Sequence, residues 1–265
     1  MFAKLLKYEW RSSRKTVATL CAVILISGLL IGSGAFAMVR FDSLTNGSEV
    51  FGGGVLILMS LCMIAVAVSC AASVFYALWR FYKSRFTEEG YLTYTLPVNN
   101  HFLILSSLLM SAVEILLVLI AAGAAVMLAL GVFSLSLPWK EIGPDTWNAM
   151  WRFLGEIGNE LGRHGEECFL LLMNMILGGI STLILLMLSV TIGAIVAKKH
   201  PILMAVLAFY GIGILRFLVT AVGLFASEEG IGDGVLATMN LSSLVTIGVG
   251  YALIYWLTSK KLNLT

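Results

Sequence analysis

The chain has 265 residues, of which 59% are hydrophobic and 12% are charged, and its formal net charge at pH 7 is +2. A soluble domain cannot bury so large a hydrophobic fraction. Polar segments interrupt the hydrophobic runs, so the composition indicates a protein that crosses a membrane several times.

The N-terminal segment, residues 1–15, has the pattern of an amphipathic helix. Its apolar side would carry Phe2, Leu5, Leu6 and Trp10, together with Glu9, and its basic residues lie largely on the other side. A basic amphipathic helix with aromatic residues on its apolar side typically lies in the membrane interface, where it would form an elbow before the first span. The alternative is a basic tail without fixed structure.

Six hydrophobic runs are each long enough to cross about 30 Å of hydrocarbon, which takes roughly 17 to 25 helical residues. They lie near Thr16–Val39, Gly54–Trp79, Phe102–Gly131, Phe169–Ala197, Ile202–Ala226 and Val235–Thr258. None alternates apolar and polar residues, as barrel strands would. The sequence therefore predicts an all-α membrane protein with six transmembrane helices, forming a single transmembrane domain over residues 1–265.

The basic residues predict the orientation of these spans, because cytoplasmic segments are enriched in lysine and arginine. With the N-terminus inside, twelve of the 17 lysines and arginines fall on the cytoplasmic side. Both termini and residues 80–101 are then cytoplasmic, and residues 137–167 form the largest extracytoplasmic segment.

Residues 80–101, RFYKSRFTEEGYLTYTLPVNNH, form a loop between the second and third spans. We expect Tyr82 and Phe86, four residues apart, to stack where the second span continues beyond the membrane. Thr87 can cap a short helix with two glutamates in its first turn. Pro97 would end that helix, because proline disfavours the helical conformation of the residue before it.

The same loop also contains a predicted start for the third span and a predicted contact surface. Asn99 or Asn100 is expected to cap the third span. Tyr91, Leu92, Tyr94 and Leu96 would form a small apolar and aromatic surface of a kind enriched at protein contacts. The alternative is an interfacial aromatic belt that anchors the spans.

The extracytoplasmic segment 137–167 has Trp147, Met150, Trp151 and Leu154 at helical spacing, with charged residues elsewhere on the helix. It predicts an amphipathic helix that lies on the outer leaflet or forms a lid over an exit.

Two charged residues lie inside predicted spans, Glu114 in the third and Arg216 in the fifth. An isolated charge at that depth is costly, so we expect the two to pair. The pair would be a gate or part of a polar path, or else a static structural bridge; Arg216 could also extend toward the interface. In the first span, Gly28 and Gly32 form a G-x-x-x-G pair that allows helices to approach closely, either at a dimer interface or within one subunit.

The sequence lacks the residue patterns of several enzymes. It has no G-x-x-x-x-G-K-[ST] loop for nucleotide phosphates and no H-E-x-x-H pattern for a metal. The four cysteines have no metal-ligand or disulfide spacing. We expect no catalysis, no cofactor and no metal in this chain.

At residue level, the opening FAKLLKYEW and the loop RFYKSRFTEEGYLTYTLPV resemble the permease subunits of bacterial ABC exporters. The closest branch is the small six-span permeases linked to peptide antibiotic export or immunity. In topology the resemblance covers the whole chain. The chain departs from the family's usual form because its largest external segment lies between spans three and four rather than before the last span.

This resemblance implies a site and its partners. In such permeases the first cytoplasmic loop holds a coupling helix that docks on the ATPase, and a second contact comes from the turn between spans four and five. The positions that match the coupling contacts are Glu88, Glu89, Gly90, Tyr91, Leu92, Thr93, Tyr94, Lys198, Lys199 and His200.

The resemblance also implies a separate ABC ATPase that binds ATP and magnesium, and a second permease copy or a homologous permease. The expected location is the bacterial cytoplasmic membrane, with the lipid bilayer as a partner and no nucleic acid. The expected function is export of an amphipathic or peptide-like substrate. The alternative is a non-transporting immunity or sensor-associated membrane protein that binds a cytosolic partner through residues 80–101.

Overall fold

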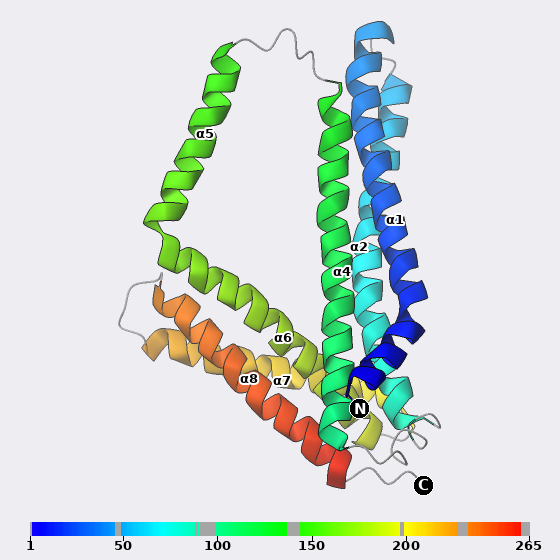
Figure 1. Cartoon of the computed structure of the whole chain (residues 1–265), viewed down its shortest axis with the longest axis vertical. Coiled ribbons are helices and arrows are strands. Elements are labelled where there is room, and N and C mark those ends of the chain that lie inside the picture. Colours follow the sequence, from blue (N-terminus) through cyan, green and yellow to red (C-terminus); the bar gives the residue numbers. More distant parts are fainter. Residues whose placement is uncertain are drawn as a thin grey trace. The chain divides into compact units, whose positions relative to one another are not determined.

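The computed structural model describes residues 2–45, 49–87, 90, 99–136, 144–196, 199–226 and 233–260. Within these ranges the chain forms α-helices and no strand (Figure 1). The helices are α1 (Phe2–Thr45), α2 (Glu49–Phe86), α4 (Asn100–Ser134), α5 (Pro144–Arg163), α6 (Gly165–Val196), α7 (Pro201–Ala226) and α8 (Asp233–Lys260). Six of them, all except α5, are long and apolar enough to cross a membrane. The predicted all-α, multi-pass membrane protein with six spans is confirmed.

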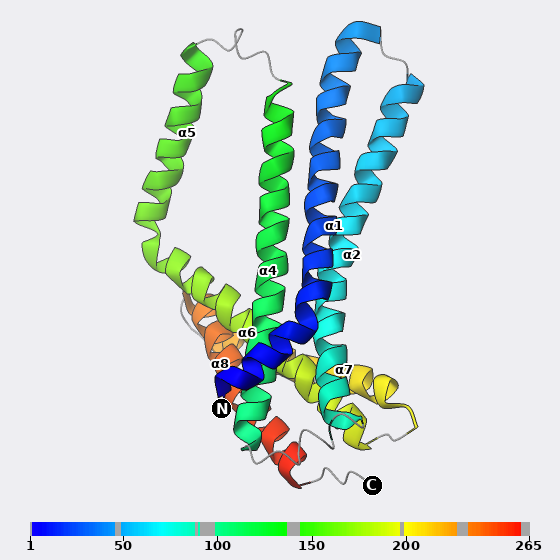
Figure 2. The same ribbon diagram turned by 45° about the vertical axis from the view of Figure 1, so that its right-hand side comes forward.

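The predicted elbow and the first span form one helix, α1, which begins at Phe2. Residues 2–27 contain neither proline nor glycine, so no residue there is a strong helix breaker. The first turns of α1 run at an angle to the rest of the helix (Figure 2). That these turns lie in the membrane interface, and that both termini are cytoplasmic, stay predictions.

Local sequence signals explain several other helix boundaries. Both α5 and α7 begin with a proline, Pro144 and Pro201, which is favoured at the first helical position because its fixed φ suits the helix. The third span, α4, begins at Asn100, beside the two asparagines predicted to cap it; which of Asn99 and Asn100 acts as the cap stays a prediction. Helix α5 lies in the predicted extracytoplasmic segment, and its Trp151 and Phe153 side chains are exposed.

The contacts within the chain group it into two compact units. Unit 1 comprises Met1–Ala77 and Leu109–Pro144, and unit 2 comprises Leu78–Leu108 and Asp145–Thr265. Helices α2 and α4 each contribute residues to both units. The single transmembrane domain over residues 1–265 stays a prediction.

Unit 1 is held together by close packing of α1 against α4. Its buried cluster contains Ile24 of α1 and Val118, Ala121 and Ala125 of α4. A Cβ atom added to Gly28 would lie 2.7 Å from the Cβ of Ala125. The backbones of α1 and α4 can lie this close together because glycine has no side chain at this position.

Gly32 makes the same kind of contact one turn later, since its added Cβ would lie 2.9 Å from the Cα of Ala129. The structure thus describes the packing of this glycine pair within one subunit. A role for the pair between two subunits stays a prediction.

Unit 2 is built on three helices, with α6 packed against both α7 and α8. Its buried cluster includes Ile184, Met187 and Leu188 of α6 and Ile254 of α8. The Nδ2 of Asn240 on α8 donates a hydrogen bond to the backbone oxygen of Leu170 on α6, over 3.2 Å.

Candidate functional site at the base of the 80–101 loop

The structure describes only part of the predicted coupling contacts. Gly90, Lys199 and His200 are described, whereas the remaining predicted contact residues lie outside the described residues; these are Glu88, Glu89, Tyr91, Leu92, Thr93, Tyr94 and Lys198. The surface predicted at Tyr91, Leu92, Tyr94 and Leu96 therefore lies outside the described residues. The site can be built from the residues that hold the loop, which we call the loop base: residues 78–87 at the end of α2 and residues 99–108 at the start of α4.

The two helices of the loop base are joined by a buried arginine. Arg85, in the last turn of α2, is 2% exposed, and its guanidinium donates a hydrogen bond to the backbone oxygen of Leu103 in the first turns of α4. A buried bond from a charged donor is stronger than a neutral one. The bond links the end of α2 to the start of α4.

Sequence reasoning missed this role, because it assigned Arg85 to the cytoplasmic excess of positive charge and to the part of the second span that continues beyond the membrane. One signal was available. Arg85 lies four residues after Phe81, on the same side of α2, and Phe81 is 1% exposed in the core of unit 2.

The chain leaves α2 through a tight turn. The backbone N–H of Gly90 donates to the oxygen of Thr87 over 2.8 Å, and the Thr87 hydroxyl donates to the oxygen of Lys83 in α2. A Cβ atom added to Gly90 would collide with the backbone oxygen of Arg85. This position therefore requires glycine. The helix that Thr87 was predicted to cap lies outside the described residues.

Aromatic side chains pack within the loop base and between it and α8. The predicted stacking of Tyr82 on Phe86 is confirmed, with ring centroids 5.9 Å apart. His101, in the first turn of α4, stacks on Tyr255 of α8 at 3.8 Å with an interplanar angle of 11°. Its Nδ1 lies 3.3 Å from the hydroxyl of Tyr251, which is also on α8. These contacts fasten the start of α4 to the end of α8.

The loop base also shares its core with α6 and α8. Phe81 of α2 and Ile104 and Leu108 of α4 are buried in the same cluster as Met187 of α6 and Ile254 of α8. The end of α2, the start of α4 and the end of α8 lie close together in the ribbon (Figure 1).

The second predicted contact lies between α6 and α7. A Cβ atom added to Gly193 of α6 would lie 2.7 Å from the backbone nitrogen of Ala205 of α7, so these helices approach closely beside the turn. Lys199 and His200 are exposed. Their side chains are available to a partner on the surface of unit 2.

The two predicted intramembrane charges lie in different units. Glu114, on α4 in unit 1, is 1% exposed. Arg216, on α7 in unit 2, donates a hydrogen bond to the hydroxyl of Ser243 on α8 over 3.0 Å. Sequence reasoning did not foresee Ser243. The pairing of Glu114 with Arg216 stays a prediction.

In the part of the chain that the structure describes, no group of three histidine, cysteine, aspartate or glutamate side chains is placed to hold a metal ion. No protein-family model, curated protein or solved structure matches this chain. The likeness to exporter permeases therefore rests on the residues quoted for it above.

Proposed function

We propose that this chain is the transmembrane subunit of an ATP-driven ABC exporter, which couples hydrolysis on a separate ATPase to movement of an amphipathic or peptide-like substrate. In this proposal residues 88–94 and the turn Lys198–His200 form the surface that receives the ATPase. The proposal starts from the resemblance of the loop RFYKSRFTEEGYLTYTLPV to that family.

One observation carries the proposal further: the two helices of the loop base are joined by a buried hydrogen bond and share one hydrophobic core. Arg85 binds Leu103 across the loop, and Phe81 and Ile104 are buried together with residues of α6 and α8. Packed interiors transmit displacement because they contain few voids. Movement of a docked ATPase against the loop would therefore move the ends of α2, α4 and α8 together.

The second contact supports the same mechanism. The exposed Lys199 and His200 follow α6, which contributes Met187 and Leu188 to the core that holds the loop base. Both predicted contact segments thus flank helices that share one hydrophobic cluster of unit 2. A single partner could act on both segments through that cluster.

The test uses the full chain, co-expressed with the separate ABC ATPase that this proposal requires, which we expect a neighbouring gene to encode, and reconstituted in proteoliposomes. Glu89→Lys and Tyr91→Ala should each lower the ATPase activity of the assembled complex about tenfold, because they alter the docking surface. Glu156→Lys, an exposed charge reversal on α5, is the matched control and should leave the activity unchanged. Circular dichroism of each variant verifies that the helices are intact.

Two results would contradict the proposal. Hydrolysis and export that survive both loop substitutions would place the coupling surface elsewhere. Co-purification of a cytosolic partner without ATPase activity would favour the alternative, a non-transporting immunity or sensor-associated protein.

A further inference from the structure

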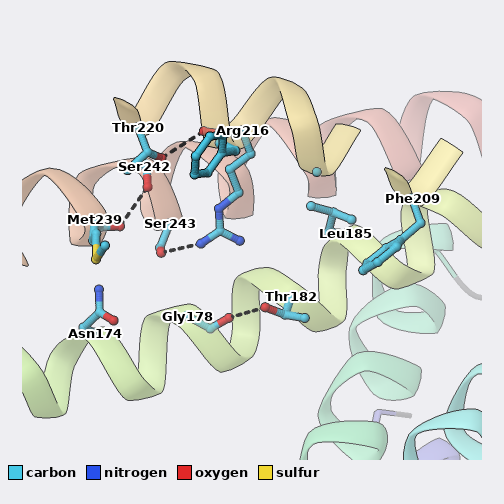
Figure 3. Close-up of a pocket in the computed structure, with 12 residues that line it drawn as sticks. Asn174, Gly178, Thr182, Leu185, Phe209, Arg216, Thr220, Met239, Ser242 and Ser243 are labelled. Atoms are coloured by element: carbon cyan, nitrogen blue, oxygen red, sulfur yellow. Dashed lines mark hydrogen bonds between the residues drawn. The ribbon is translucent and has the colours of Figure 1, made fainter. Parts of the chain in front are cut away.

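Unit 2 contains a cavity of about 370 Å³ between α6, α7 and α8, lined by apolar side chains and a smaller set of polar ones (Figure 3). We call it the Arg216 cavity. The polar side chains that line it are Asn174 and Thr182 of α6, Arg216 and Thr220 of α7, and Ser242 and Ser243 of α8. All of them lie within helices that can span a membrane.

The cavity carries one positive charge. The guanidinium of Arg216 points from α7 toward α6, and its NH2 donates to the hydroxyl of Ser243, which is 1% exposed (Figure 3). No aspartate or glutamate is among the residues that the structure describes as lining the cavity. A guanidinium has five N–H donors, and within unit 2 the described side chains accept a bond from it only at Ser243.

A second donor lies in the same cavity. The side-chain amide of Asn174 is directed from α6 toward α8, with its nitrogen pointing into the space below Met239 (Figure 3). Among the described residues no hydrogen bond is recorded for this amide. By contrast, the hydroxyls of Thr182 and Thr220 donate to backbone oxygens of their own helices, over 2.8 Å and 2.9 Å.

The walls around these donors are apolar and aromatic. Leu185, Phe209, Phe217 and Met239 line the cavity beside its polar groups. A volume near the lower end of the usual range for ligand pockets, about 300–1,000 Å³, suits a head group with the first part of an apolar chain rather than a whole peptide.

The structure assigns the Arg216 cavity as a binding site for the oxyanion head group of an amphiphile, a phosphate or carboxylate carried on an apolar chain. Arg216 and Asn174 would donate to the anion, Ser243 would hold the guanidinium in place, and Phe209 and Phe217 would contact the chain. A cation inside a membrane span is costly without a counter-charge, and an anionic ligand supplies one. This site does not depend on coupling to an ATPase, because binding can be measured on the isolated chain.

Binding is measured on the purified full-length protein in neutral detergent micelles, by native mass spectrometry and isothermal titration. The probes are phosphatidylglycerol, dodecyl phosphate, inorganic phosphate and zwitterionic phosphatidylcholine. Either anionic amphiphile should bind at least about tenfold more tightly than phosphatidylcholine or inorganic phosphate. Preference for phosphatidylglycerol identifies a bilayer lipid as the source, and preference for dodecyl phosphate identifies a diffusible amphiphile.

The variants locate the site. Arg216→Gln should weaken binding of the preferred probe about tenfold or more, and Arg216→Lys should retain part of it because the charge remains. Arg152→Gln, an exposed arginine on α5, is the matched control and should bind as the wild type does. If Arg216→Gln does not fold, Asn174→Leu is measured in its place. Asn174 is half-buried, and its replacement should weaken binding about threefold or more.

Several results would overturn the assignment. Binding that is equal in wild type and Arg216→Gln would place the anion elsewhere. Inorganic phosphate or phosphatidylcholine that binds as tightly as the anionic amphiphiles would rule out an amphiphile site. Binding that appears only in Glu114→Gln would assign Arg216 to the predicted pair with Glu114.

Discussion

The guanidinium of Arg85 donates a hydrogen bond to the backbone oxygen of Leu103, and so joins the helix that enters the 80–101 loop to the helix that leaves it. The arginine is buried in the last turn of α2, beside the hydrophobic cluster that contains Phe81 and Ile104. This one hydrogen bond therefore holds together the two helices that flank the loop.

Replacing Arg85 by methionine keeps most of the apolar stem and removes the charged donor. Arg85→Met should lower the free energy of unfolding by about 1.5–3 kcal/mol, the usual contribution of a hydrogen bond to a charged group. Thermal unfolding in detergent micelles measures the change. Arg152→Met, at an exposed cation on α5, is the control and should change stability by less than about 0.5 kcal/mol. Equal effects of the two substitutions would show that the bond to Leu103 contributes nothing.

Gly90→Ala should loosen the turn after α2, because the added methyl group would meet the backbone oxygen of Arg85. We expect hydrogen exchange of the residue 85–90 amides to become about tenfold faster, as the local structure opens more often. Gly131→Ala in α4 is the control, since nothing lies within 4 Å of its added Cβ. Unchanged exchange in Gly90→Ala would mean that the turn accommodates a side chain.

The stacked pair His101 and Tyr255 should contribute a measurable coupling between α4 and α8. A double-mutant cycle with His101→Ala and Tyr255→Leu is expected to give a coupling energy of about 0.5–1.5 kcal/mol in thermal unfolding. His101→Phe retains an aromatic ring and should preserve most of that coupling. Additive effects of the two truncations would show that the rings do not interact.

Gly28→Ala should destabilise unit 1, because its Cβ would lie 2.7 Å from that of Ala125 and the two helices would have to separate. Overpacking of this kind costs about 1–3 kcal/mol. The matched control is Gly123→Ala in α4, where the added Cβ has nothing within 4 Å. Unfolding of both variants in micelles distinguishes them. A variant that keeps its stability but loses a dimer would instead assign Gly28 to an interface between subunits.

The sequence alone determined the class of protein and the positions of its spans. Hydrophobic runs of sufficient length require helices in a bilayer, since a helix satisfies its backbone hydrogen bonds internally, and the six predicted runs correspond to α1, α2, α4, α6, α7 and α8. The stacking of Tyr82 on Phe86 was also predictable, because it joins residues four apart on one helix.

Only the tertiary structure decided which side chains meet between helices. Arg85 and Leu103 lie 18 residues apart, and His101 and Tyr251 lie 150 residues apart. No periodicity links such pairs, because the packing of α4 against α8 depends on the whole set of helices in unit 2. Arg216 illustrates the same limit. Its presence in a span was visible in the sequence, but the cavity around it and the hydroxyl of Ser243 exist only once α6, α7 and α8 have packed together.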